Sequence, residues 1–354
     1  MGRSLRVKPE YIDKVKSALQ RNGYPSQKSL ADDVGFSLST VKNFLNGIAV
    51  DYLNFVEISG KLGFDWQEIA HKETQTTKGE TSPFITGAPI TEPRYFFGRE
   101  KELKRLFNIL KRYPLQNAAI IGKKRSGKTS LLHYIKNITT TPAQQLRPGQ
   151  KSDWLPHPEN YQWVFVDLQD ARMQSREGLL KHILESLQMK VPTPCDLDHF
   201  MDVVSDNLSS PTVILLDEIG VGLQRCPELD DTFWESLRSL ATNHTRGNLA
   251  FILATPQSPI ELAKSTGHSS PFFNIFGYTA YLEALTEAEA WELIASSPIA
   301  FSEVDVEWIL RESKCWPLLL QILCRERLFS LEEGETDNNW REEGLRQIQP
   351  FANV

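Results

Sequence analysis

The sequence predicts an α/β fold, in which helices flank a parallel β-sheet and a small helical lid follows, with an all-α domain in front. Three observations support this class. Apolar runs at 118–121, 162–168, 213–216, 249–254 and 278–282 alternate with amphipathic helical segments, a pattern typical of buried parallel strands. The first run passes directly into a glycine-rich turn and a helix start. Residues 9–70 show helical periodicity.

Composition places the chain among ordinary globular proteins. Its 354 residues are 40% hydrophobic and 24% charged, which predicts two or three domains with sizeable cores. The apolar runs fall well short of a membrane span, and the N-terminus has no apolar signal core, so we expect a cytoplasmic protein without membrane contact. The four cysteines form no C-x-x-C pair, which argues against a zinc site or a disulfide framework.

The net charge of −6 is unevenly distributed. Residues 1–72 carry 10 Lys and Arg against 8 Asp and Glu, whereas residues 73–354 carry 29 against 37. Seven of the bases lie in the first 28 residues. A basic front on an acidic body favours an anionic partner at the front, although a basic stretch is equally compatible with a solvated face.

Two short helices near the N-terminus are predicted to form a helix-turn-helix. The first buries Leu30, Ala31 and Val34 and ends at Gly35, and the second begins after a capping serine, Ser37. The pattern Leu-Ala-x-x-x-Gly-x-Ser-x-x-Thr-Val-x-x-x-Leu-Asn-Gly over residues 30–47 resembles the headpieces of lambda-repressor-like and lac-repressor-like regulators.

That resemblance implies binding to duplex DNA, with the second helix in the major groove. The residues expected to face bases are Leu38, Ser39, Lys42 and Asn43. Gln27, Lys28 and the basic N-terminus would contact phosphates. The alternative is a helical bundle that contacts a protein partner. The weak net charge of this segment favours that alternative.

The strongest motif is a phosphate-binding loop between a strand and a helix. The pattern G-x-x-x-x-G-K-[S/T] is formed by Gly122, Lys123, Lys124, Arg125, Ser126, Gly127, Lys128 and Thr129, followed by Ser130. Backbone N–H groups of such a loop bind phosphate oxygens. Lys128 is predicted to contact the terminal phosphates and Thr129 to ligate Mg²⁺, so the expected cofactors are ATP and Mg²⁺.

A second acidic motif follows the apolar strand at 213–216. Asp217 is expected to hold the magnesium ion, and Glu218 to take a proton from the attacking water. Parallel sheets bind ligands at the carboxyl ends of their strands, which is where this pair falls.

The order of these motifs over residues 94–330 resembles the P-loop NTPases of the AAA+ class, most closely the origin-recognition and signal-transducing STAND branches. An aromatic-Gly-Arg box upstream of the loop carries the branch resemblance and implies that Phe97, Gly98 and Arg99 lie beside the adenine. The resemblance also implies that Thr255, or else Gln257, senses the γ-phosphate. Pro317 would cover the base, although Cys315 replaces the glycine usual in that turn.

AAA+ proteins commonly receive an arginine from a neighbouring subunit, yet residues 247–310 contain none. Either Arg246, Arg238 or Lys264 takes the place of this arginine finger, or the chain has no such finger, which predicts slow ATP turnover. We therefore expect an ATP-dependent regulatory switch that binds DNA and forms an ATP-dependent homo-oligomer or binds a protein partner. The alternative is an ATPase whose N-terminal bundle recruits a protein, in defence signalling or in transposition-type or loader-type assembly on DNA.

The predicted boundaries follow from these segments: a helix-turn-helix bundle at 1–70, a linker at 71–93, an ATPase core at 94–283, a helical lid at 284–330 and a tail at 331–354.

Overall fold

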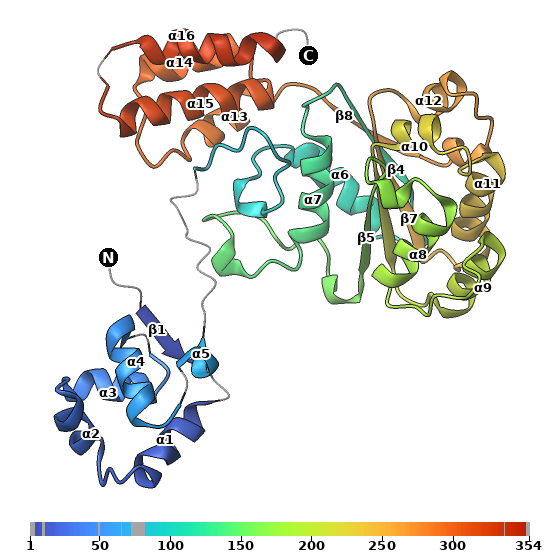
Figure 1. Ribbon diagram of the computed structural model, residues 1–354. Coiled ribbons are helices and arrows are strands. Elements are labelled where there is room, and N and C mark those ends of the chain that lie inside the picture. Colours follow the sequence, from blue (N-terminus) through green and yellow to red (C-terminus); the bar gives the residue numbers. More distant parts are fainter. Residues whose placement is uncertain are drawn as a thin grey trace. The chain divides into compact units, whose positions relative to one another are not determined.

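The structure is a computed structural model, and it describes residues 4–8, 11–48, 50–64, 66–71, 82–335 and 337–351 (Figure 1). The chain divides into two compact units, Met1–Thr81 and Ser82–Val354. Within the described residues, no helix combines the length and apolar character that crossing a membrane requires.

The first unit is a helical bundle with its own core. Its helices are α1 (Ile12–Arg21), α2 (Gln27–Val34), α3 (Leu38–Leu45), α4 (Tyr52–Lys61) and α5 (Trp66–Ile69). Phe44 and Phe55 are fully buried at its centre, with ring centroids 4.9 Å apart. The C-cap of α2 is Gly35 in the left-handed conformation, and Ser37 caps α3 by accepting a hydrogen bond from the Thr40 N–H.

The prediction that this unit is all-α was wrong. A small antiparallel sheet, in the order β2-β1-β3, joins β1 (Ser4–Val7), β2 (Val50–Asp51) and β3 (Ala70–His71). Two of these strands have two residues each, too few to show the alternation by which strands are recognised in a sequence. The third overlaps the basic N-terminal segment.

The second unit is built on a five-stranded parallel sheet, in the order β5-β6-β7-β4-β8. The strands are β4 (Ala118–Gly122), β5 (Gln162–Asp167), β6 (Thr212–Asp217), β7 (Leu249–Thr255) and β8 (Tyr278–Leu282). Strand β7 lies between the phosphate-loop strand β4 and the acidic strand β6. All five strands point the same way, so their carboxyl ends share one edge of the sheet.

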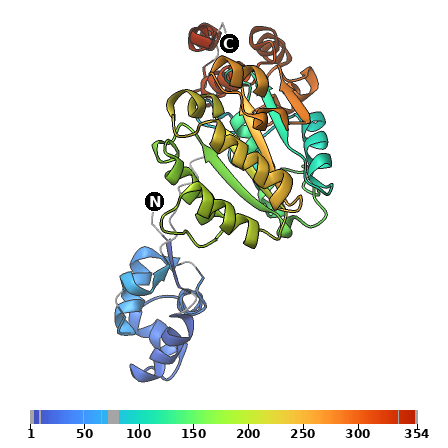
Figure 2. The same cartoon turned by 90° about the vertical axis from the view of Figure 1, so that its right-hand side faces the viewer.

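Helices cover both faces of this sheet (Figures 1 and 2). On one face, Val213 and Leu215 pack with α6 (Glu100–Leu110) and α7 (Lys128–Asn137). On the other, Ile214 and Leu216 pack with five helices: α8 (Arg176–Ser186), α9 (Leu197–Asn207), α10 (Ile219–Arg225), α11 (Asp231–Ser239) and α12 (Pro259–Ser265). The burial of both faces explains why the central strands are continuous apolar runs.

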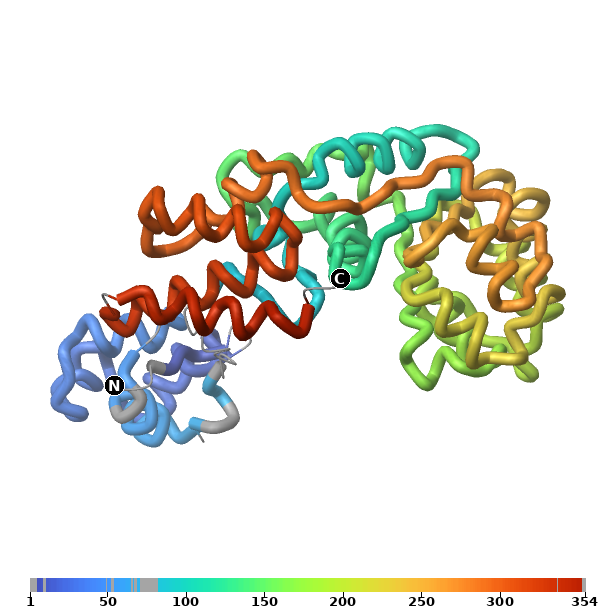
Figure 3. Tube along the Cα trace, turned by 90° about the horizontal axis from the view of Figure 1, so that it is seen from above, coloured from blue at the N-terminus to red at the C-terminus, as the bar shows by residue number. Residues whose placement is uncertain are grey.

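The helical lid follows β8 and consists of α13 (Glu287–Ile294), α14 (Glu303–Ser313), α15 (Pro317–Glu332) and α16 (Asn339–Ile348), seen side by side in Figure 3. The segment predicted as a tail therefore contributes α16 to the lid. Buried Asp305 on α14 pairs with Arg327 of α15 at 2.9 Å and with Arg341 of α16 at 2.8 Å. This ion triad joins three of the four helices.

Residues 82–91, which belong to the predicted linker, pack into the second unit, and we call them the strap. Phe84 is buried in the lid core, and the Ile85 N–H donates to the Gln321 side chain at 3.0 Å. Further along, the Ile90 N–H donates to Ser130 at 3.0 Å. The strap thus contacts both the lid and the phosphate-loop helix, although its composition is that of a linker.

Candidate nucleotide-binding site

The phosphate loop leaves the buried strand β4 and turns into α7. Gly127, the N-cap of α7, has φ 94°, a left-handed value that side chains rarely adopt. The Lys128 ammonium folds back over the loop and donates to the carbonyl oxygens of Gly122 and Lys123, each at 2.9 Å. Backbone N–H groups at the start of α7 and the positive end of that helix therefore face the same space as this ammonium.

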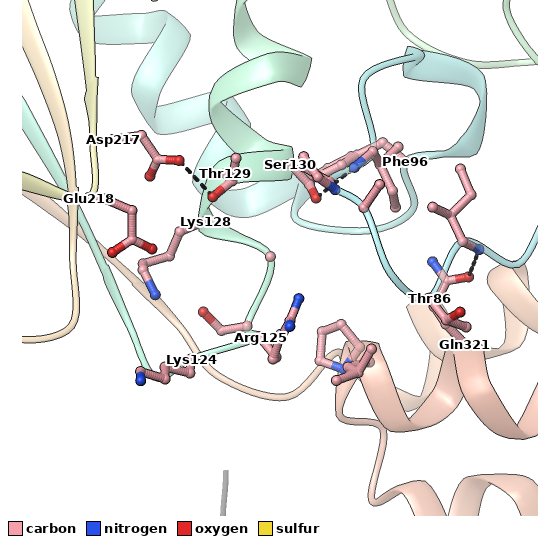
Figure 4. A pocket seen from close by; sticks show the side chains of 18 of the residues that line it. Thr86, Phe96, Lys124, Arg125, Lys128, Thr129, Ser130, Asp217, Glu218 and Gln321 are labelled. Atoms are coloured by element: carbon pink, nitrogen blue, oxygen red, sulfur yellow. Dashed lines mark hydrogen bonds between the residues drawn. The ribbon is translucent and has the colours of Figure 1, made fainter. Parts of the chain in front are cut away.

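The acidic motif lies beside this loop, at the carboxyl end of β6. The Thr129 hydroxyl donates to Asp217 Oδ2 at 2.7 Å (Figure 4), although strand β7 lies between β4, which leads to the loop of Thr129, and β6, which ends at Asp217. Burial raises the pKa of Asp217 to about 6, and the Thr129 hydrogen bond opposes that rise. Burial also lowers the pKa of Lys128, against the attraction of Glu218 and Asp217.

A cavity of about 680 Å³ extends from this acidic corner to the lid. That volume is within the usual range for small-ligand sites. Figure 4 shows Asp217, Glu218 and Lys128 at one end, and Thr86 with Gln321 at the other. The predicted residues that line it are Lys124, Arg125, Ser126, Gly127, Lys128, Thr129, Ser130, Asp217, Glu218, Phe97, Arg99 and Pro317.

Two buried polar atoms at the phosphate end have no partner among the described residues: Ser126 Oγ and Asp217 Oδ1. Buried polar atoms are nearly always hydrogen-bonded, so an unpartnered pair fits a polar ligand. Asp217 and Thr129 present the carboxylate and hydroxyl oxygens that Mg²⁺ prefers. The loop amides and Lys128 fit a triphosphate, as do Lys124 and Arg125, whose side chains have no ion pair or hydrogen bond within the described part of the chain.

Arg99 connects the phosphate loop to the junction between sheet and lid. It is only 6% exposed, and its guanidinium donates to the carbonyl oxygens of Ser126, at 3.4 Å, and of Glu283. Burial lowers the pKa of Arg99, and nearby glutamates oppose this. Phe97 and Pro317 line the lid side of the same cavity. An apolar ring and a proline are suited to contact a flat aromatic base.

Four predicted site residues do not line the cavity: Gly122, Lys123, Gly98 and Thr255. Thr255 is fully buried and donates its hydroxyl to the Gln257 carbonyl at 2.9 Å, so this hydroxyl does not face the cavity in the structure. The Gln257 amide donates to Ser265 at 3.0 Å. Neither residue is therefore positioned to contact a phosphate here.

Several lining residues escaped the sequence prediction. Asp167 ends β5 in register with Asp217, and Gln321 lies one helical turn after Pro317. Arg225 is the last residue of the helix that Glu218 caps, and no sequence motif marks it. The strap lines the cavity from Ile85 to Ile90 and gave no sequence signal, since it binds largely through backbone groups.

In the first unit, the predicted DNA-facing residues lie on or beside α2 and α3. Lys28, Leu38, Ser39 and Lys42 are exposed, whereas Gln27 and Asn43 are half-buried. Leu38 is unusual for its type, with 38% of its surface exposed. The exposed side chains of α3 therefore form a small mixed face of one apolar, one hydroxyl and one basic group.

No protein family model matches the sequence, and a sequence search of curated proteins finds no relative. Solved structures are similar in fold. A Walker-type ATPase of Pyrococcus abyssi aligns with a TM-score of 0.54 at 16% identity, over 76% of this chain and 77% of that one. The ORC2 protein of Aeropyrum pernix, solved as ADPNP and ADP complexes, aligns with a TM-score of 0.55 at 14% identity, over 75% and 71%. The predicted fold class is confirmed: the second unit has a P-loop ATPase fold of the AAA+ type.

Proposed function

We propose that this chain is an ATP-binding regulatory switch that hydrolyses ATP slowly and binds duplex DNA through its first unit. The observation that carries the proposal is one cavity that combines a phosphate loop, two successive carboxylates and a lid. A binding protein without hydrolysis needs no second carboxylate, so Glu218 next to Asp217 favours an enzyme.

The residues divide the chemistry between them. Lys128 and the loop amides bind the β- and γ-phosphates, while Thr129 and Asp217 hold Mg²⁺. The metal, when bound, neutralises charge on the phosphates. Glu218 accepts a proton from the attacking water as the water oxygen forms a bond to the γ-phosphorus. The bond from that phosphorus to the β–γ bridging oxygen breaks, and ADP leaves with the electron pair.

The strap supports a regulatory role. It contacts the lid through Gln321 and through Arg325, whose guanidinium donates to Thr86 Oγ1 at 2.6 Å, and it contacts α7 through Ser130. The chain continues from the strap toward the first unit. A nucleotide in the cavity would contact strap, lid and loop together, so its presence would bias how the strap is held.

Two substitutions test the ATPase. Lys128→Ala should abolish ATP binding, because the phosphates lose their nearest cation. Glu218→Gln should keep binding and lose about 10²-fold or more in hydrolysis, since only the proton acceptor is removed. Lys136→Ala, at the far end of the same helix, is the matched control and should behave as the native protein. Equal hydrolysis by all four proteins would refute these roles.

The exposed face of α3 supports the DNA hypothesis, and salt dependence tests it. Binding of the full chain to random duplex should weaken steeply as salt rises, because contacts to phosphates release counterions. Lys42→Ala should weaken binding further, whereas Lys61→Ala removes the same charge from α4 and should have little effect. Absence of any salt-sensitive complex at micromolar protein would eliminate DNA and favour a protein partner for this unit.

A further inference from the structure

The cavity holds an arginine that belongs to none of the expected phosphate motifs. Arg225 is the last residue of α10, and Glu218 is the N-cap of the same helix. Both line the cavity, together with Val221. Residues three and four apart share a helix face, so Glu218, Val221 and Arg225 lie along one side of α10. That side faces the phosphate end.

The direction of the side chain also favours a phosphate contact. Long side chains on a helix lean toward its N-terminus. The N-terminus of α10 is Glu218, which lies at the carboxyl end of β6. This tendency favours an Arg225 side chain that extends back over Val221, toward the carboxylate that is expected to activate water.

Arg225 is also available. Its side chain is exposed, and among the residues that the structure describes it has neither an ion pair nor a hydrogen bond. Most other arginines of this unit with a cavity or lid position are engaged: Arg99 by carbonyl oxygens, Arg327 and Arg341 by Asp305. A cation that faces an anion-binding cavity without a partner is suited to a phosphate.

The three cations considered from the sequence as substitutes for a finger do not line the cavity. Arg246 lies beside Gly247, whose carbonyl accepts from the Leu115 N–H before β4 begins. It is thus at the amino end of the strands, the opposite edge of the sheet from the phosphate loop. Arg238 and Lys264 belong to α11 and α12, which cover one face of the sheet.

We propose that Arg225 contacts the γ-phosphate from within the same chain and supplies the positive charge that a neighbouring subunit provides in many relatives of this fold. This inference rests on the proposed ATPase function. The planar guanidinium donates two parallel hydrogen bonds to phosphate oxygens and stabilises the charge that develops as the γ-phosphoryl group transfers. Hydrolysis then needs no second subunit. Slow turnover is still expected, because GTPases with an arginine held in cis turn over at only about 10⁻² s⁻¹.

Single-turnover hydrolysis tests the proposal on the full chain. Arg225→Ala should lower the rate about 10³-fold or more, and Arg225→Lys should recover only a part, because an ammonium lacks the planar fork. Arg172→Ala is the control, since Arg172 is exposed near the end of β5 and lies outside the cavity. The native rate per subunit should not rise with protein concentration. Full activity of Arg225→Ala would overturn the proposal.

Mixing two inactive variants separates action in cis from action in trans. Glu218→Gln retains Arg225, and Arg225→Ala retains an intact acidic motif. If the arginine acts on its own chain, the mixture stays inactive at every ratio. Recovery of activity on mixing would show that the arginine acts on a neighbour, and would overturn the assignment in cis.

Binding distinguishes failure of this inference from failure of the ATPase proposal. Arg225→Ala should weaken ATP binding more than ADP binding, because only ATP has the γ-phosphate, and this ratio is measurable even without turnover. An unchanged ratio would overturn the role of Arg225 while the ATPase stands. A native protein that binds neither nucleotide would remove the ATPase proposal, and this inference with it.

Discussion

Gly98 is predicted to be a position at which one added methyl group clearly lowers the stability of the second unit. Its φ is +72°, and a Cβ added there would lie 2.8 Å from Glu289 Cδ and 3.0 Å from two further atoms of that side chain. The Glu289 carboxylate accepts hydrogen bonds from the Arg99 N–H at 2.6 Å and from the Thr286 N–H at 2.9 Å. It thereby fastens the entry turn of the core to the first lid helix.

The cost of Gly98→Ala has two parts. A non-glycine residue in the left-handed region costs about 1–2 kcal/mol. Displacing the Glu289 carboxylate breaks at least the bond from Arg99, and a hydrogen bond to a charged group is worth about 1.5–3 kcal/mol. We therefore expect Gly98→Ala to lower the free energy of unfolding by about 3–5 kcal/mol. Gly149→Ala is a matched control, with φ +74° and nothing within 4 Å of the added Cβ. It should cost only the backbone part.

Urea denaturation followed by tryptophan fluorescence measures these costs in the second unit, because all tryptophans except Trp66 lie there. A double-mutant cycle isolates the clash. In a Glu289→Ala background the Cγ and Cδ atoms are gone and only the Cβ at 3.0 Å remains, so Gly98→Ala should cost little more than Gly149→Ala does. The coupling free energy should then be about 2 kcal/mol. Strict additivity of the two substitutions, or equal costs at Gly98 and Gly149 in the native background, would refute the reasoning.

Two further predictions concern the lid. Burial alone would raise the pKa of Asp305, but hydrogen bonds from Arg341 and Ser302 and the charge of Arg327 hold it below its ordinary value. Because the pKa of Asp305 is lower in the folded than in the unfolded state, this carboxylate stabilises the fold above its unfolded pKa of about 4. That stability is lost as the pH falls through the folded pKa, so lid unfolding should become easier below about pH 4. Asp305→Asn should remove that pH dependence and destabilise the lid by about 3–5 kcal/mol at neutral pH, measured by urea denaturation, because two half-buried arginines lose their charged partner. Gln321→Ala removes the acceptor of the Ile85 N–H in the strap, so a protease should then cut the strap faster in limited proteolysis. An unchanged cleavage rate would contradict the contact.

The sheet and the phosphate loop were predictable because their signals are local. The strands β4, β6 and β7 are buried on both faces, so each is a continuous apolar run that stands out in the sequence. The phosphate loop has fixed residue types at fixed spacing. Thr129 and Asp217 were both expected to bind one Mg²⁺, and the structure joins their side chains by a hydrogen bond.

Other features depend on geometry that no local pattern carries. The role of Arg225 depends on the phase of α10 relative to the cavity. Thr255 occupies the end of the expected strand, yet its hydroxyl turns to the Gln257 carbonyl, an orientation that a strand-end position leaves open. The two-residue strands of the first unit pair through backbone groups that every sequence possesses.

The strap is the most informative of these cases, because it relates a weak sequence signal to regulation. Its bonds to Gln321 and Arg325 of the lid are one neutral hydrogen bond and one from a charged guanidinium, worth together about 2–4 kcal/mol. That range overlaps the usual coupling free energy between two allosteric sites of about 1–3 kcal/mol, a factor of about 5 to 150 in affinity. A switch of ordinary strength therefore needs no large rearrangement in this chain: it needs only that nucleotide binding makes or breaks these two contacts. Because binding free energies are linked, a partner of the first unit that responds to ATP must then shift ATP affinity by the same factor.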